Sequence, residues 1–142
     1  KKKRTIENKT VLILKSADKV AIRKRAEKGL LAGLYEFPNL EEHLSEEEIL
    51  EYVKQQGFSP IRIQRLDDVK HIFTHREWHM SGYAVKIEEL EEPQELEAKR
   101  NNFLFIEPSE TEEKYPIPSA FSGFTKHMAI RLGNEKFQKE NE

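Results

Sequence analysis

The sequence predicts one α+β domain built on a mixed β-sheet. Short runs rich in β-branched residues recur along the chain, whereas two other segments carry apolar residues at helical spacing. Their order of two strands, a short strand, a helix, several strands and a final helix is typical of this fold class. A length of 142 residues is enough for one modest hydrophobic core.

The N-terminal part is expected to form strands. Two β-branched runs, near residues 10–16 and 19–25, flank a Ser-Ala-Asp-Lys connection that is typical of a hairpin. The next stretch, KGLLAGLYEFPN, contains two glycines and a proline, which predict a loop followed by a short strand at Leu34–Phe37. The first helix is therefore expected only after this stretch.

That helix should cover about residues 46–56. Ser45, with Glu48 three residues later, matches the capping box that begins many helices, and Gly57 ends the apolar stripe. Alternation of apolar and polar residues then resumes at Ile61 and predicts further strands.

A long strand from about Glu77 should be buried on both sides, because both of its faces carry apolar residues. One face carries Tyr83, Val85 and Ile87, and the other carries Trp78, Met80 and Ala84. After it, EELEEPQELE is expected to be an exposed loop or a short helix, and FLFI a brief strand. Apolar residues from Phe121 to Leu132 recur at helical spacing and predict the last helix.

Composition limits the functions that this chain can have. Charged residues make up 35% of it and hydrophobic residues 37%, with a net charge of −2, so the protein is not uniformly basic. The absence of cysteine excludes disulfides, Cys-ligated zinc and an iron–sulfur cluster held by this chain. No apolar run approaches the roughly 18 residues that span a membrane, so we expect no membrane partner and a cytoplasmic location.

The stretch HIFTHREWHM holds three of the five histidines and the one tryptophan of the chain. A metal site is disfavoured here, because His75 and His79 on a strand would lie about 13 Å apart, too far to share one zinc ion. We interpret His71 and His79 as half-buried strand residues, and Trp78 and Met80 as core residues.

Phe73, Thr74 and His75 then remain as the informative part of this stretch. They fall where one predicted strand ends and the next begins, and should therefore form the tip of a hairpin. Such a tip is exposed and held by rigid strands, and these side chains offer an aromatic ring, a hydroxyl and an imidazole. They are the groups that a loop reading nucleic-acid bases requires.

Two motifs give the sequence a resemblance to a known family. KGLLAGLYEFPN and VKHIFTHREWHMSGYAV resemble the GLLAGLWEFP segment and the K-H-x-F-[ST]-H stretch in the C-terminal domain of MutY-type adenine DNA glycosylases. The resemblance covers about Thr10 to Leu132. It implies a Nudix (MutT-like) fold, a mixed sheet sandwiched between helices. It also implies an 8-oxoguanine-recognition domain at 10–133. From the residues themselves we expect the end of an interdomain linker at 1–9 and a frayed tail at 134–142.

The same resemblance implies a role for the hairpin tip. In that family the loop reaches the 8-oxoguanine opposite the adenine that is removed, and here Phe73, Thr74 and His75 hold its positions. Thr74 stands where serine is usual, which keeps the hydroxyl, and Tyr35 replaces the usual tryptophan of the other motif. The implied ligand is double-stranded DNA that contains 8-oxoguanine paired with adenine.

A larger parent enzyme is also implied. It would be an adenine DNA N-glycosylase of base excision repair, with its catalytic domain and a 4Fe-4S cluster upstream of Lys1. This chain would then carry no catalytic residue, metal or cofactor of its own. The N-terminal catalytic domain of the same polypeptide would be its partner beside DNA, in a monomeric bacterial protein.

Basic residues gather at two places despite the acidic total. Lys70 and Arg76 flank the hairpin tip and are expected to contact DNA. A second cluster, near the GLLAGL loop, is expected to offer phosphate contacts and comprises Arg23, Lys24, Arg25 and Lys28. For its two arginines, solvation of an exposed strand face is an equally good explanation.

Two other functions stay open. An active Nudix hydrolase of oxidised nucleotides such as 8-oxo-dGTP would need the magnesium-binding box G-x5-E-x7-R-E-U-x-E-E-x-G-U. With Gly57-Phe58 at the end of that box, Glu51 is the one acidic residue kept in its R-E-U-x-E-E part, and Lys54 occupies a carboxylate position. A protein-interaction module would instead use the acidic stretch Glu88–Glu95.

Overall fold

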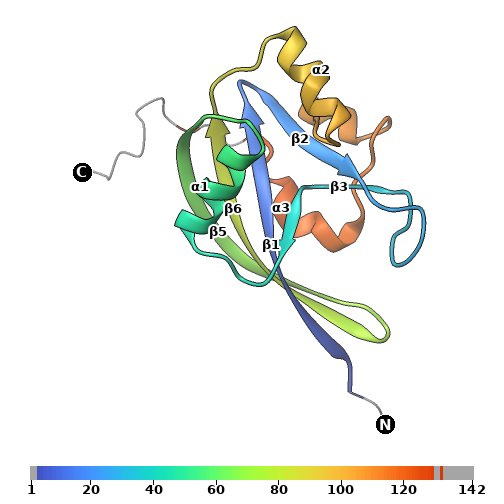
Figure 1. The fold of residues 1–142 in the computed structure, drawn as a ribbon. Coiled ribbons are helices and arrows are strands. Elements are labelled where there is room, and N and C mark those ends of the chain that lie inside the picture. Colours follow the sequence, from blue (N-terminus) through green and yellow to red (C-terminus); the bar gives the residue numbers. More distant parts are fainter. Residues whose placement is uncertain (1–2, 130–131, 133–142) are drawn as a thin grey trace.

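The computed structural model describes residues 3–129 and 132, which form a mixed sheet covered on both faces (Figure 1). Within this part the strands are β1 (Thr5–Ser16), β2 (Lys19–Lys24), β3 (Tyr35–Glu36), β4 (Asn39–Glu41), β5 (Pro60–Ile72), β6 (Arg76–Ile87) and β7 (Leu104–Ile106). The main order is β3-β2-β1-β6-β5, while β4 pairs with β1 and β7 pairs with β2. The β1–β6 pair is parallel and the other pairs are antiparallel.

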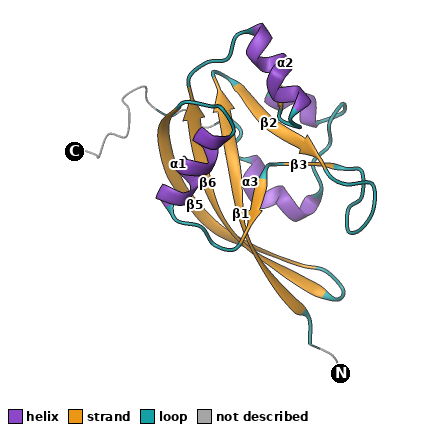
Figure 2. Ribbon diagram, viewed as in Figure 1, coloured by secondary structure: helices purple, strands orange, loops and turns teal. Residues whose placement is uncertain are grey.

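Helices lie on both sides of this sheet, as Figure 2 shows. On one face, α1 (Glu46–Gln55) and α2 (Glu92–Arg100) contribute Ile49, Val53 and Ala98 to a core with Leu12 and Val85. On the other, the 3-10 turn Ser119–Phe121 and α3 (Ser122–Thr125) contribute Phe121 and Phe124 to a second core around Trp78. A further 3-10 turn covers Pro108–Thr111. The predicted α+β sandwich is therefore confirmed.

Strand β6 contributes side chains to both cores, which lie on opposite faces of the sheet. Its residues Tyr83, Val85 and Ile87 belong to the α1 side, and Trp78, Met80 and Ala84 belong to the α3 side. Successive side chains of a strand point to opposite faces, so a sheet covered on both sides requires apolar residues at consecutive positions. The predicted burial of this strand on both sides is confirmed.

Helix α1 has the ends that its sequence predicts. The hydroxyl of Ser45 accepts a hydrogen bond from the backbone N–H of Glu48, and the Glu48 carboxylate accepts one from the Ser45 N–H, which completes the capping box. After the last turn, Gly57 has a φ of 93°, a conformation that glycine adopts without a Cβ penalty. The helix ends at Gln55, one residue earlier than predicted.

The N-terminal boundary needs a correction. Strand β1 begins at Thr5, and its first residues pair in parallel with β6 from Arg76 onward. The segment Thr5–Lys9, expected to belong to a linker, is therefore part of the sheet. Its side chains are mostly polar because this end of the strand is exposed, so the alternation that marks a half-buried strand is missing.

The last predicted helix is shorter than expected. Its apolar residues Phe121, Phe124 and Met128 are buried as the helical spacing predicts, but α3 ends at Thr125 and turns follow. The predicted tail from 134 to 142 lies outside the described residues. The acidic stretch, expected as a loop or a short helix, forms a helix from Glu92.

The outer ends of β1, β5 and β6 extend beyond the body of the domain as a three-stranded arm (Figure 1). We define this hairpin arm as residues 4–8 and 70–79. It carries the tip that the sequence marks as a candidate reading loop. The sheet therefore provides a rigid support for that loop.

Candidate nucleic-acid interface

The tip of the hairpin arm is a short, well-anchored turn. Strand β5 ends at Ile72 and β6 begins at Arg76, so Phe73, Thr74 and His75 form the connection, as predicted. The Phe73 N–H donates to the Arg76 carbonyl at 2.8 Å. The start of β1 anchors the same turn.

Two hydrogen bonds make this anchor. The Arg4 Nε donates to the Phe73 carbonyl at 3.0 Å, and the Thr5 N–H donates to the His75 carbonyl at 3.1 Å. Both carbonyls belong to the turn, so a third strand fixes it from the side. A turn held at both ends presents its side chains without a large ordering cost on binding.

The three tip residues differ in their exposure to solvent. Thr74 and His75 are exposed, whereas Phe73 is half-buried. The ring centroid of Phe73 lies 4.9 Å from that of Trp78 in an edge-on arrangement, and 4.7 Å from that of His71. Phe73 therefore anchors the loop to the core, and the groups that face outward are the Thr74 hydroxyl and the His75 imidazole.

Beneath the tip, Glu7 joins Trp78 and Arg76. Trp78 is 1% exposed, and its indole Nε1 donates to one carboxylate oxygen of Glu7 at 2.9 Å. Arg76 Nη1 donates to the other oxygen at 3.0 Å. A buried indole N–H needs such an acceptor, because leaving it unpaired costs about 1–3 kcal/mol. Glu7 was missed in the sequence, and the one signal for it is the demand of a core tryptophan for an acceptor.

The cations predicted beside the tip lie on the arm. Lys70 is exposed, and Arg76 keeps 42% of its side chain exposed although it pairs with Glu7. Glu77 follows Arg76 on β6, on the opposite face of the arm. The hydrogen bond from His79, with the positive charges of Lys70, His79 and Arg4, holds the pKa of the Glu77 carboxyl below its usual value. The acidic groups of the arm are thus engaged within it.

The histidines of this stretch have separate partners. His71 packs against Phe73, His79 Nε2 lies 2.9 Å from a Glu77 oxygen, and His75 is exposed. His71 and His79 are half-buried, as predicted. Across residues 3–129 and 132, no three His, Cys, Asp or Glu side chains come together as a group able to hold a metal ion.

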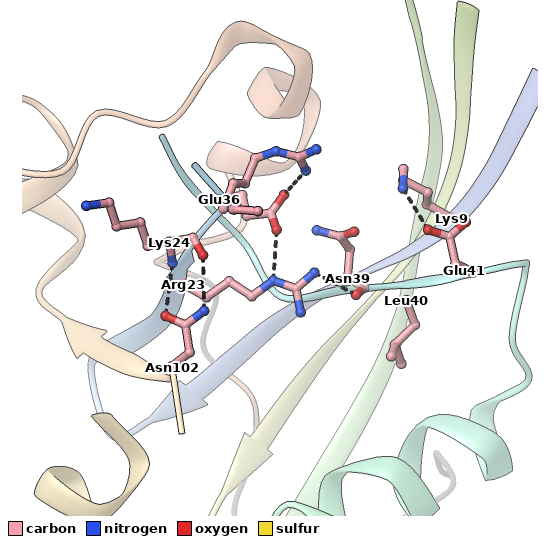
Figure 3. A pocket seen from close by; sticks show the side chains of 10 residues that line it. Lys9, Arg23, Lys24, Glu36, Asn39, Leu40, Glu41 and Asn102 are labelled. Atoms are coloured by element: carbon pink, nitrogen blue, oxygen red, sulfur yellow. Dashed lines mark hydrogen bonds and ion pairs between the residues drawn. The ribbon is translucent and has the colours of Figure 1, made fainter. Parts of the chain in front are cut away.

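The second basic cluster has a different structure. Glu36 on β3 is 2% exposed, and it lies between the two arginines of the cluster (Figure 3). Arg23 Nε donates to one of its oxygens at 2.8 Å, and Arg25 Nη1 donates to the other at 2.6 Å. Both arginines are therefore held by one buried carboxylate, which offsets half of their combined charge.

Further contacts fix both arginines. Arg23 also donates to the Asn39 carbonyl at 3.0 Å, and Arg25 donates to the Leu30 carbonyl at 3.0 Å. The guanidinium carbon of Arg25 lies 5.4 Å from the centre of the Trp78 ring. Both residues therefore hold the structure together, which explains their presence without any phosphate contact.

The two lysines of this cluster are more accessible. Lys28 is exposed, and Lys24 keeps 51% of its side chain exposed while it pairs with Glu27. Lys24 lines a polar pocket of about 460 Å³ whose other residues are Lys9, Arg23, Arg25, Ala26, Glu36, Asn39, Leu40, Glu41 and Asn102. Of the four predicted phosphate contacts, the lysines are thus the better placed.

Helix α1 does not suit a catalytic magnesium ion. In its last two turns, the positions where a Nudix box has carboxylates carry Glu51, Lys54 and Gln55. The Gln55 amide lies 3.5 Å from the exposed carboxylate of Glu51. Tyr52 is half-buried, and burial raises the pKa of its hydroxyl, opposed in part by Arg23. One exposed carboxylate beside an ammonium does not form the oxygen-rich site that magnesium prefers.

A comparison with models of known protein families identifies the family that has this fold. The model of the NUDIX domain family matches residues 10–127, so the chain belongs to the NUDIX domain family. Within the described residues there is no helix long and apolar enough to cross a membrane. A search of curated proteins found no match.

Solved structures with this fold include a domain of a MUTYH protein and NUDIX hydrolases. The C-terminal domain of mouse MUTYH, in a complex with human PCNA, is 21% identical with a TM-score of 0.61, over 91% of this chain and 93% of that one. The MutT NUDIX hydrolase of Burkholderia pseudomallei is 13% identical with a TM-score of 0.60, over 90% and 100%. A NUDIX hydrolase of Nitrosomonas europaea is 11% identical with a TM-score of 0.59, over 90% and 93%. At these identities the likeness shows the fold.

Proposed function

We propose that this chain is the lesion-recognition domain of a MutY-type adenine DNA glycosylase, and that it binds duplex DNA with 8-oxoguanine opposite adenine. The observation that carries this proposal is the anchored tip, which presents Thr74 and His75 to solvent while Phe73 packs inward. The fold shared with the C-terminal domain of mouse MUTYH supports it. So do the two sequence motifs of the family.

The chemistry of the lesion fits a loop of this kind. Guanine presents N7 as a hydrogen-bond acceptor in the major groove. Oxidation at C8 turns N7 into an N–H donor and adds a carbonyl oxygen beside it. The hydroxyl of Thr74 can accept from that N–H, and an imidazole N–H or a backbone N–H can donate to the oxygen. Normal guanine cannot satisfy this pattern, and each buried unpaired group costs about 1–3 kcal/mol.

Removal of the base belongs to another part of the parent enzyme under this proposal. A glycosylase has to flip its target base into a pocket and activate the glycosidic bond by acid catalysis. We assign that step, together with a 4Fe-4S cluster, to the N-terminal catalytic domain of the same bacterial, cytoplasmic polypeptide. The present domain then contributes recognition of the opposite base.

A working Nudix hydrolase is the alternative that the fold itself raises, because several structures with this fold are hydrolases. The side chains on α1 argue against it, since Lys54 and Gln55 occupy carboxylate positions. Incubation of the chain with magnesium and 8-oxo-dGTP should release no pyrophosphate. Release of pyrophosphate at a catalytic rate would establish the hydrolase instead.

The proposal is tested by two variants of one residue. Thr74→Val removes the hydroxyl and keeps the shape of the side chain, whereas Thr74→Ser keeps the hydroxyl. In a fusion with a MutY-type catalytic domain, the preference for adenine opposite 8-oxoguanine over adenine opposite guanine should fall roughly 5- to 100-fold in Thr74→Val. Thr74→Ser should keep it.

A His75→Ala variant in the same fusion should also lower the preference. Thr111→Ala is the matched control, because Thr111 is a partly exposed threonine in the 3-10 turn outside the arm. It should leave the preference unchanged. Equal preference in wild type and Thr74→Val would contradict the proposed function.

A further inference from the structure

One row of side chains on the hairpin arm includes two exposed apolar residues. Ile6 on β1 and Ile72 on β5 both pair with Glu77 on β6, so the three residues form a row across the arm. Directly paired residues point to the same face of a sheet. Ile6 is 57% exposed and Ile72 49%, although both are large apolar residues. We call this surface, with the next row of Asn8, His79 and Lys70, the open face of the arm.

Among residues 3–129 and 132, the loop before α1 covers this face near the body of the domain. The Thr10 hydroxyl donates to the Glu42 carbonyl at 2.7 Å and accepts from the Leu44 N–H at 2.8 Å, so the loop before α1 closes over Thr10. Ile6 lies four residues farther out on the same strand face. The opposite face of the arm carries the buried Trp78 and is packed against the second core.

The charges around the open face favour a polyanionic partner. The arm holds the cations Arg4, Lys70 and Arg76 and the carboxylates of Glu7 and Glu77. Arg76 and Glu7 pair with each other on the opposite face of the arm, beside Trp78, so the cations next to the open face are Arg4 and Lys70. Both carboxylates are already engaged, Glu7 by Arg76 and Trp78, and Glu77 by His79. Arg4 lies 3.6 Å from a carboxylate oxygen of Glu77 but keeps 45% of its side chain exposed, and Lys70 is exposed.

We propose that the open face enters the major groove together with the tip, and that Ile6 and Ile72 contact the apolar edges of DNA there. Ile72 lies two residues before Thr74, about 7 Å along the strand. The major groove is about 8.5 Å deep. This inference rests on the proposed function, because a Thr74 hydroxyl that reaches a base edge brings Ile72 within the depth of the groove.

The apolar edges available in the groove are thymine methyl groups and deoxyribose carbons. Arg4 and Lys70 flank the two isoleucines and are placed to contact phosphates on either side. None of these contacts reads the oxidised base. The open face therefore adds affinity for DNA with or without the lesion, whereas the tip adds preference for the lesion.

The absence of cysteine makes this placement directly testable. In Ile72→Cys the new thiol is unique and can carry a benzophenone cross-linker. Irradiation should cross-link position 72 to DNA in duplexes that contain either A·8-oxoG or A·G, beside the lesion in the first and at positions spread along the duplex in the second. Leu96→Cys is the matched control, because Leu96 is 52% exposed on α2, at the far side of the body from the arm (Figure 1). It should cross-link only at background level.

Affinity gives the second readout. The double variant Ile6→Thr and Ile72→Thr keeps β-branched residues at exposed sites, so it should fold normally. It should bind both duplexes roughly three- to tenfold more weakly than wild type and keep the ratio between them. Leu96→Thr should bind as wild type does.

The two proposals fail in distinguishable ways. If the label at position 72 gives background cross-linking while Thr74→Val loses lesion preference, the open face is not a DNA contact and the proposed function stands. If position 72 cross-links but Thr74→Val keeps the preference, the proposed function fails and the arm is a general DNA-binding element. Cross-linking of position 72 to an added catalytic domain, in place of DNA, would overturn the inference in favour of a protein contact.

Discussion

The hairpin arm and the second basic cluster both concentrate basic residues, but these residues have different surroundings. We call the second cluster, which begins on β2 and comprises Arg23, Lys24, Arg25 and Lys28, the β2 cluster. In the cluster, the buried carboxylate of Glu36 binds Arg23 and Arg25, and backbone carbonyls take further donors from both. On the arm, Lys70 is exposed, and Arg76 pairs with Glu7, which also accepts a hydrogen bond from the Trp78 indole. A count of basic residues does not show this difference: the arginines of the cluster are fixed in partly buried contacts, whereas Lys70 and Arg76 on the arm remain more exposed to a ligand.

The largest expected effect is the loss of Glu36. Glu36→Gln should lower the free energy of unfolding by about 3–5 kcal/mol, because two partly buried guanidinium groups lose their counter-charge. Glu41→Gln is the control, since Glu41 pairs with Lys9 but keeps 75% of its side chain exposed. Urea unfolding of both variants provides the measurement. A Glu36→Gln protein as stable as wild type would show that the two arginines do not hold this region together.

A smaller loss is expected at Glu7. Glu7→Ala leaves the Trp78 indole N–H without its acceptor and should destabilise the domain by about 1–3 kcal/mol in urea unfolding. Glu7→Gln retains a side-chain oxygen for that N–H, and should recover much of the loss. If both variants were equally unstable, the ion pair between Glu7 and Arg76, rather than the hydrogen bond from Trp78, would account for the lost stability.

The cations of the two regions should differ in DNA binding. Lys70→Ala should weaken binding to any duplex a few-fold and reduce the salt slope of log affinity by about 1, as expected for one lost phosphate contact. Arg23→Ala, measured on the folded fraction, should leave that slope unchanged because Arg23 is engaged by Glu36 and Asn39. Titrations at several salt concentrations by fluorescence anisotropy compare the two. The reverse result would move the DNA surface to the β2 cluster.

The smallest effect is a dependence of stability on pH at the arm. The pKa of Glu77 is lowered in the folded domain, so its ionised form adds stability above the pKa of the unfolded chain. That stability is lost as the pH falls through the lowered folded pKa. Wild type should therefore lose more thermal stability than Glu77→Gln between neutral and acidic pH. Parallel melting curves of the two proteins across that range would contradict the assigned interaction.

Much of the fold could be predicted because its signals are local. The capping box at Ser45 and Glu48 and the glycine after α1 depend on a few adjacent residues, and the structure has them as predicted. The two apolar faces of β6 follow from the alternation of side chains along one strand. The hairpin tip follows from the break between two such patterns.

The remainder depends on contacts between distant parts of the chain. Glu7 and Trp78 are 71 residues apart in the sequence, and the polar start of β1 carries no strand pattern of its own. Glu36 and its arginines lie closer together, but Arg23, Arg25 and Glu36 look like ordinary surface charges until their burial is known. The position of the hairpin tip could therefore be predicted from the sequence, but not which basic side chains are engaged by carboxylates.

The most direct test of the recognition role is an NMR titration of the ¹⁵N-labelled domain with two duplexes that differ only in 8-oxoguanine or guanine opposite adenine. The backbone amide signals of Thr74 and His75 should shift with the 8-oxoguanine duplex, and much less with the guanine duplex at the same concentration. Signals of Arg23 and Arg25 should stay in place with both. Equal shifts at the tip with the two duplexes, or shifts confined to the β2 cluster, would contradict the account.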